Sequence, residues 1–104
     1  MHCLYQDADG YHPCMFVETI IAPREDWESW TERIGLLTDP PEALVAVVAW
    51  ESGDVEVTSV HVWESPAAVG DFFMERVRPI IEAEGEPTHK PRRHGEAVAF
   101  YLRQ

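Results

Sequence analysis

The chain has 104 residues, a net charge of −11 and a hydrophobic fraction of 45%. Its length suits one domain with one core. Its acidic surface would repel phosphate backbones, so we expect no nucleic-acid partner. No apolar run approaches the roughly 20 residues that cross a bilayer, and the N-terminal residues lack the basic-then-apolar pattern of a secretory signal. We therefore expect a cytoplasmic protein without membrane association.

The N-terminal segment, residues 1–13, shows no hydrophobic period and predicts a tail that precedes a single domain over residues 14–104. In and beside it lies a crude set of metal ligands, His2, Cys3, His12 and Cys14. Their spacing matches no established zinc site, and cysteines of cytosolic proteins are usually reduced. We expect no metal site, and the role of this set stays open.

The first part of the domain predicts a strand and then a helix. Residues 14–22, CMFVETIIA, are mostly apolar or β-branched and stop at Pro23, which is typical of a strand. Trp27, Trp30 and Ile34 then recur at helical spacing. They indicate a helix over residues 24–36 that packs these side chains in the core and ends around Gly35.

A hairpin follows that helix. Residues 43–51, ALVAVVAWE, are nearly all apolar and predict a strand. Ser52, Gly53 and Asp54 supply a tight turn into a second strand over residues 54–63.

The second helix has a clear start signal, because Ser65 is a good N-cap and Pro66 suits the first helical position. Pro79 should kink its final turn, and Gly85 should end it. A polar loop then leads to a last strand over residues 96–102. The apolar stripe of this helix comprises Val69, Phe72, Phe73, Val77, Ile80 and Ile81.

The order β-α-β-β-α-β predicts an α+β, ferredoxin-like fold: an antiparallel four-stranded sheet with two helices on one face. Two helices cover one face of such a sheet, yet residues 43–50 and 97–102 place apolar side chains on both faces. A second copy that packs sheet to sheet is the simplest cover. We therefore expect a twofold homodimer.

The passage from the third strand to the second helix resembles the dimeric α+β barrel superfamily, and within it the antibiotic-biosynthesis monooxygenase-like domains. In those domains a tryptophan, a polar cap and an alanine mark the junction between strand and helix. Here this junction, called the seam, contains the matching residues Trp63, Ser65 and Ala68. His61 stands where those domains commonly have an acidic residue, and Phe72 stands where the haem-degrading branch has its iron-ligating histidine.

That resemblance covers residues 14–102, and it implies a ligand pocket between the sheet and the second helix. It does not imply haem, because phenylalanine cannot ligate iron. The chain also contains no asparagine, the residue that commonly helps to hold substrate in the aromatic-oxidising branch. No flavin, nicotinamide or phosphate-binding glycine motif is present, so we expect no cofactor.

The candidate catalytic residue is His61, which shares a strand face with Val57, Ser59 and Trp63 because side chains alternate along a strand. A neutral imidazole in an apolar pocket is a competent general base. Trp63 would offer a flat wall to an aromatic ring. The alternative is that His61 is a satisfied core histidine and Trp63 is ordinary packing.

Other residues complete the candidate substrate site. Phe72 and Phe73 would form its opposite wall. Arg76 would meet an anionic group at the mouth, or else lie along the surface with its head in water. Tyr101 would offer its hydroxyl to a ligand, or else pack. Glu18 interrupts an apolar strand, and we expect it to pair with Arg76 or with an arginine of the second subunit rather than act as an acid/base group.

Two functions follow for this small homodimer. The first is a cofactor-independent monooxygenase or isomerase that acts on a small aromatic or ring-bearing substrate. The second is a non-catalytic ligand-binding or structural dimer of unknown function. A basic loop, residues 89–94, is either a solvated connector or a contact for an anion or for the partner's acidic helix.

Overall fold

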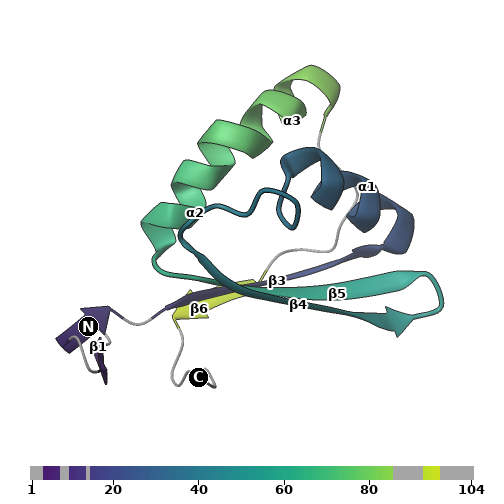
Figure 1. The fold of residues 1–104 in the computed structure, drawn as a ribbon. Helices are drawn as coiled ribbons and strands as arrows, with labels where there is room; N and C mark the ends of the chain where they lie inside the picture. The colour runs from purple at the N-terminus through teal and green to yellow at the C-terminus, as the bar shows by residue number, and fades with distance from the viewer. Residues whose placement is uncertain (1–3, 8–9, 14, 86–92, 97–104) are drawn as a thin grey trace.

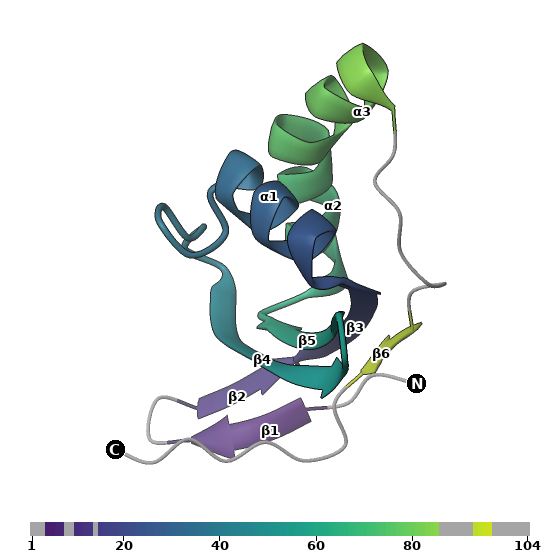
Figure 2. The same ribbon diagram turned by 90° about the vertical axis from the view of Figure 1, so that its right-hand side faces the viewer.

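The computed structural model describes residues 4–7, 10–13, 15–85 and 93–96. Within these residues a four-stranded antiparallel sheet carries all of the helices on one face, as Figures 1 and 2 show from two sides. The elements in chain order are β1 (Leu4–Asp7), β2 (Gly10–Pro13), β3 (Phe16–Pro23), α1 (Arg24–Ile34), β4 (Leu44–Gly53), β5 (Glu56–Trp63), α2 (Pro66–Phe72), a π-helical segment η1 (Phe73–Val77), α3 (Arg78–Glu84) and β6 (Arg93–Glu96).

The strand order in the main sheet is β4-β5-β3-β6, and every neighbouring pair is antiparallel. The first strand of the β-α-β-β-α-β unit therefore lies in the interior, between the third and the fourth. This arrangement confirms the predicted α+β class and is compatible with a ferredoxin-like fold. The central position of β3 and β5 puts the candidate site residues of both strands beneath the helices.

Both ends of the chain differ from the sequence-based expectation. β1 and β2 pair as a short antiparallel hairpin in the segment expected to be an irregular tail. The hairpin projects beyond the end of the sheet at which β3 begins (Figure 1). β6 begins at Arg93, inside the expected polar loop, because backbone pairing with Phe16–Thr19 needs no apolar side chains. The rest of the predicted last strand, residues 97–102, falls outside the described residues.

Helix α1 ends where the sequence predicts an end signal. Gly35 adopts a left-handed conformation with φ of 69°, which an L side chain rarely tolerates. Its amide donates to the carbonyl of Glu32, and the amide of Leu36 donates to the carbonyl of Thr31. Leu36 is therefore outside the helix but returns to the core, where it is 1% exposed.

The second predicted helix runs from Pro66 to Glu84 as three consecutive segments, α2, η1 and α3. The Ser65 hydroxyl accepts a hydrogen bond from the amide of Ala68 at 3.2 Å, which confirms the predicted N-cap. Before Pro79 the helix widens, and the Arg78 amide donates to the carbonyl of Phe73, five residues earlier. A proline lacks an amide hydrogen and clashes with the preceding turn, so a wider turn relieves both problems.

The core lies between the sheet and the helices and comprises Ile34, Leu36, Trp63, Phe72 and Val77. Trp63 is 1% exposed, and its ring centroid lies 5.2 Å from that of Phe72, in a tilted arrangement. These contacts fix the start of α2 onto the end of β5. None of the helices in the described residues is both long enough and apolar enough to cross a bilayer.

Candidate functional site

A cavity of about 360 Å³ lies between the helices and the sheet. This volume falls in the range of small-molecule sites, roughly 300–1,000 Å³. β3 and β5 supply its floor, α1 supplies one wall and α2 with η1 supplies the other. Most of the lining is apolar or aromatic, including Ile20, Ala22, Trp27, Trp30, Ile34, Leu36, Val69, Phe72, Phe73, Met74 and Val77.

Two ionisable side chains, Glu18 and His61, line this apolar cavity from the sheet. Antiparallel pairing of β3 and β5 places them directly opposite each other, so their side chains emerge on the same face. Glu18 is 7% exposed and His61 is 4% exposed. Ser59 and Trp63 flank His61 on that face and are also buried, which confirms the common side predicted from strand alternation.

A hydrogen-bonded chain joins these groups. His61 Nδ1 lies 3.0 Å from Glu18 Oε1, and His61 Nε2 lies 2.7 Å from Ser59 Oγ. An ionised carboxylate only accepts, so with Glu18 ionised the hydrogen between the two groups belongs to Nδ1 of His61. In the tautomer that carries this one hydrogen, Nε2 accepts from the Ser59 hydroxyl. Trp63 Nε1–H also donates to Glu18 Oε1, at 3.3 Å. The buried carboxylate is thus held by two donors from β5.

This geometry corrects the expected partner of Glu18. The sequence suggested Arg76 or an arginine of a second subunit. Arg76 bonds to Ile34 and Asp39 instead, and within the described chain His61 and Trp63 donate to the carboxylate, while pairing across subunits stays a prediction. The pairing was missed because Glu18 and His61 are 43 residues apart in the chain. Only the register of β3 against β5 brings them together. The available signal was a carboxylate inside one apolar strand and a histidine inside another strand that could pair with it.

Arg76 lies at the edge of the site and does not line the cavity. Its guanidinium Nη1 donates to the carbonyl oxygens of Ile34 at 3.2 Å and Asp39 at 2.6 Å, and Nη2 approaches the Asp39 carboxylate at 3.5 Å. It also lies 5.3 Å from the centroid of the Phe72 ring. Through these contacts, Arg76 connects η1 to the end of α1 and to the α1–β4 loop, next to the cavity wall.

The remaining predicted site residues divide into three groups. Phe72 and Phe73 line the cavity, as the apolar stripe indicated. Trp63 lies under the floor, packed on Phe72 and bonded to Glu18, rather than in the lining. Tyr101 falls outside the described residues, as do Lys90 and Arg92 of the basic loop.

The structure adds residues that the sequence pattern assigned to the core or did not single out. Trp27 and Trp30 of α1 are half-buried and form a wall of the cavity. Asp26, in the first turn of the same helix, also lines it. Helical spacing identifies a buried stripe, but it does not separate side chains that fill a core from side chains that surround a cavity.

Two other candidate features are described only in part. His94 belongs to β6, where it is exposed and its ring centroid lies 5.4 Å from that of Phe16. His2, Cys3 and Cys14 fall outside the described residues, and the side chain of His12 is likewise not described. The possible metal set at the N-terminus therefore stays a sequence observation.

No protein-family model matches the chain, and no curated protein matches it significantly. The resemblance to the antibiotic-biosynthesis monooxygenase-like domains therefore rests on the fold class and on the seam between β5 and α2. Functional inference has to come from the cavity itself.

Proposed function

We propose that this protein is a cofactor-independent enzyme, a monooxygenase or an isomerase, that abstracts a proton from a small ring-bearing substrate bound in the cavity. The observation that supports this most directly is the buried Glu18–His61 pair, joined at 3.0 Å and facing an apolar cavity of about 360 Å³. A base beside an apolar site that excludes water is a recurrent arrangement for removing a carbon-bound proton.

The proposal divides the work between the two residues. Both ring nitrogens of His61 are engaged, one with Glu18 and one with Ser59. A carboxylate carries no hydrogen and takes up a proton directly, so we assign the role of the base to Glu18. His61 then acts as a positioning residue that orients the carboxylate and stabilises its charge through Nδ1–H. This revises the expectation that His61 itself is the base.

Two reactions of the substrate carbanion are possible once the proton has moved to Glu18, and in both of them atoms and electrons balance. Return of the same proton to a different carbon of the substrate gives an isomer and regenerates the carboxylate. Alternatively, the carbanion of a CH₂ group reacts with dioxygen, so that one oxygen atom becomes a carbonyl oxygen and the other leaves as water. The second outcome consumes one dioxygen per turnover, which separates the two in a closed vessel.

Deuterium exchange tests proton abstraction before the natural substrate is known. 2-Tetralone is a two-ring ketone with acidic carbon-bound hydrogens beside its carbonyl group. The protein in D₂O is expected to accelerate its deuterium uptake above the buffer rate, measured by mass spectrometry. Glu18→Gln keeps the shape and an acceptor oxygen but not the base, so its rate is expected to fall to that of buffer. No acceleration by the parent protein would count against this chemistry.

The alternative is a ligand-binding protein without catalysis. It is favoured by the fact that both nitrogens of His61 are already hydrogen-bonded within the chain, as in a satisfied structural histidine. Under this alternative, 2-tetralone binds in the cavity but exchanges no faster than in buffer. The Glu18→Gln variant then retains the affinity for 2-tetralone, so binding and exchange measured together distinguish the two functions.

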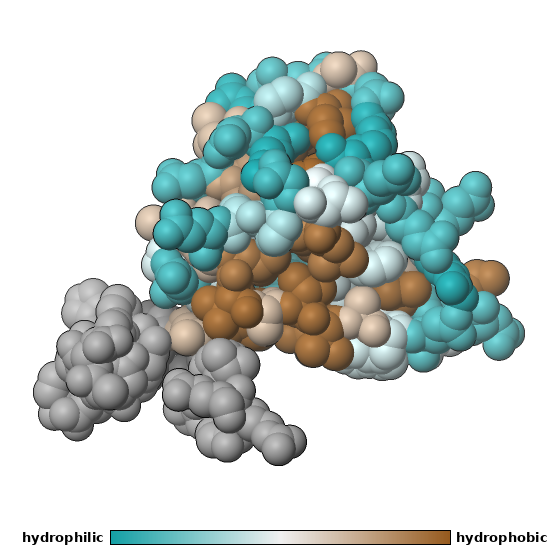
Figure 3. Space-filling view, viewed as in Figure 1, coloured by the Kyte–Doolittle hydropathy of each residue, from teal (hydrophilic) through white to brown (hydrophobic). Residues whose placement is uncertain are grey.

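We also propose that the molecule assembles as a dimeric α+β barrel through the helix-free face of the sheet. Val48 and Trp50 of β4 pair with Val60 and Thr58 of β5, opposite the cavity side. Val48 is 60% exposed and Trp50 is 48% exposed. Figure 3 shows apolar surface gathered along the sheet while the helices above are mostly hydrophilic. A soluble chain gains by covering such a face with a second copy.

Light scattering tests this assembly. The parent protein is expected to be a dimer at micromolar concentration. Trp50→Asp is expected to be a folded monomer, because dimer formation would bury the new carboxylate at the interface. Val55→Asp is the control, since Val55 is 73% exposed in the turn after β4. A monomeric parent, or equal dissociation of both variants, would contradict the proposed interface.

A further inference from the structure

We infer that the cavity selects ring-bearing ligands that carry a protonated nitrogen over ligands that carry an anionic group. The inference rests on the proposed function in one respect, that the cavity binds a small ring-bearing molecule. It adds the charge class of that molecule, which neither the fold nor the seam between β5 and α2 indicates.

The charged side chains that the described residues place in the cavity lining are acidic. Among the described residues, its lining contains the carboxylates of Glu18 and Asp26 and contains no lysine or arginine. The net charge of −11 adds a negative field around the whole molecule. An anionic ligand would therefore enter against both the local and the overall field.

Two arginines lie against aromatic residues of the wall, but both are paired with carboxylates. Arg33 is 5.9 Å from the ring centroid of Trp30 and forms an ion pair with Glu84. Arg76 is 5.3 Å from the ring centroid of Phe72 and is occupied by the α1–β4 loop, including the carboxylate of Asp39. Neither guanidinium lines the cavity. Within the described residues, the two arginines are thus paired with Glu84 and Asp39 outside the cavity.

The polar floor favours a ligand that donates hydrogen bonds. The Nδ1–H of His61 and the indole N–H of Trp63 are directed at Glu18, and the Ser59 hydroxyl is directed at His61. These donors are satisfied within the chain and have little left for a ligand oxyanion. The carboxylate of Glu18, by contrast, is an acceptor without a donor of its own. A ligand hydroxyl can donate to a carboxylate, and a protonated amine donates with a favourable charge as well.

The aromatic walls act in the same direction. Trp27, Trp30, Phe72 and Phe73 line the cavity, and the face of an aromatic ring attracts a cation. Such rings also stack on the ring of a ligand. A cavity that combines these walls with carboxylates therefore suits an aromatic amine better than an aromatic acid.

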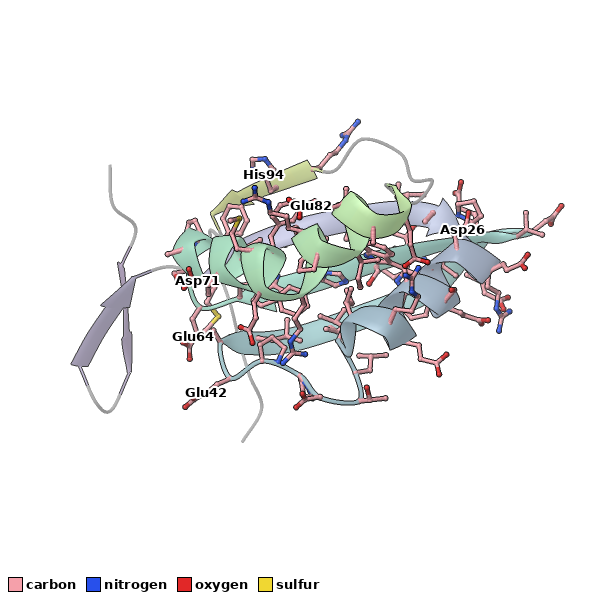
Figure 4. The ribbon with its side chains drawn as sticks, turned by 90° about the horizontal axis from the view of Figure 1, so that it is seen from above. Asp26, Glu42, Glu64, Asp71, Glu82 and His94 are labelled. Atoms are coloured by element: carbon pink, nitrogen blue, oxygen red, sulfur yellow. The ribbon has the colours of Figure 1, made fainter. Side chains whose placement is uncertain are left out.

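Asp26 is the residue that can be tested for this selectivity without disturbing the floor. It lies at the start of α1, at the end of the helix layer opposite Asp71, Glu64 and Glu42, as Figure 4 shows from above. Its neighbour Glu25 belongs to the same first helical turn but is exposed and does not line the cavity. Asp26 and Glu25 thus carry the same charge and lie at the same end of the helix dipole, but only Asp26 faces the cavity.

Three probes of matched shape measure the selectivity: 2-(1-naphthyl)ethylamine, 2-(1-naphthyl)ethanol and 1-naphthylacetate, titrated calorimetrically at pH 7. The amine is expected to bind tightest and the carboxylate weakest, with about tenfold or more between them. Asp26→Asn is expected to weaken the amine about three- to tenfold and to leave the alcohol unchanged. Glu25→Gln is expected to change the affinity for each probe by less than about twofold.

Each other result has a definite meaning. If the alcohol binds but the carboxylate binds as tightly as the amine or tighter, the inferred charge class is wrong and the ring-binding cavity stands. If Asp26→Asn and Glu25→Gln weaken the amine equally, the preference comes from the general field, and the assignment to the cavity is wrong. If none of the three probes binds, the proposed function falls together with the inference.

Discussion

Removing the acceptor oxygen of Glu18 tests whether this carboxylate satisfies the buried donors of β5. Glu18→Leu and Glu18→Gln both remove the charge and keep a similar volume, so the cost of burying a carboxylate cancels between them. Glutamine retains an oxygen at the place of Oε1, which accepts from His61 at 3.0 Å and from Trp63 at 3.3 Å in the parent. Leucine leaves both N–H groups without this acceptor.

The expected difference follows from those two bonds. A buried donor left unsatisfied costs about 1–3 kcal/mol, so two cost about 2–6 kcal/mol. The extra apolar surface of leucine offsets up to about 2 kcal/mol of this. The difference between the two costs spans about 0–6 kcal/mol. We expect Glu18→Leu to be less stable than Glu18→Gln by the middle of this span, about 2–4 kcal/mol, a large part of the roughly 5–15 kcal/mol typical of a domain.

Urea unfolding followed by tryptophan fluorescence measures this difference, provided that the two variants share one m-value. Equal stability of the two variants, or a more stable Glu18→Leu, would refute the hydrogen-bonded chain. Because Glu18 is replaced in both, neither its charge nor its loss from the cavity lining explains a difference between them.

Three further predictions concern the surroundings of the site. Trp63→Ala is expected to lower the free energy of unfolding by about 3–5 kcal/mol, because the residue is 1% exposed. Trp63→Phe keeps most of the packing and is expected to lower it by about 1–2 kcal/mol through the lost bond to Glu18. Equal losses for the two variants, measured by urea unfolding, would contradict this. Arg76→Ala is expected to lower the free energy of unfolding by about 1–3 kcal/mol, because the carbonyls of Ile34 and Asp39 lose their donor. Asp39→Ala is expected to lower it by less than about 1 kcal/mol, because the Asp39 side chain is 85% exposed. A larger loss for Asp39→Ala than for Arg76→Ala would show that the ion pair contributes more than the bonds to the carbonyls. Titration with haemin is expected to give no Soret shift, since Phe72 stands where the haem-degrading domains that the chain resembles have their iron-ligating histidine, and a shift abolished by removing one histidine would show the opposite.

The sequence predicts the elements that local patterns control. Period-two alternation is enough to place Ser59, His61 and Trp63 on one buried face. Ser65 and Pro66 are enough to locate the start of α2, because a cap acts within one turn. Gly35 similarly marks the end of α1 through its backbone conformation.

The parts that were missed depend on contacts between distant segments. Glu18 meets His61 only through the register of β3 against β5, and the volume of the cavity depends on how Trp27 and Trp30 stand against η1. The sequence predicts a disturbance at Pro79, but it does not specify the form that the disturbance takes, a π-helical segment before the proline. β6 begins with Arg93 and His94, which carry no strand pattern, because an edge strand needs only backbone partners.

The four tryptophans allow one measurement that tests the ligand cavity directly. Trp27 and Trp30 line the cavity, Trp63 bonds to its floor, and Trp50 lies on the opposite face of the sheet. Each gives one indole N–H signal in a ¹H–¹⁵N NMR spectrum, assigned with single Trp→Phe variants.

Addition of 2-(1-naphthyl)ethanol, which is neutral and so independent of the charge class, is expected to shift the signals of Trp27 and Trp30 strongly. Trp63 is expected to shift through Glu18, and Trp50 to stay in place. A spectrum in which Trp50 alone moves, or in which no indole signal moves at millimolar ligand, would contradict a ligand site between the helices and the sheet.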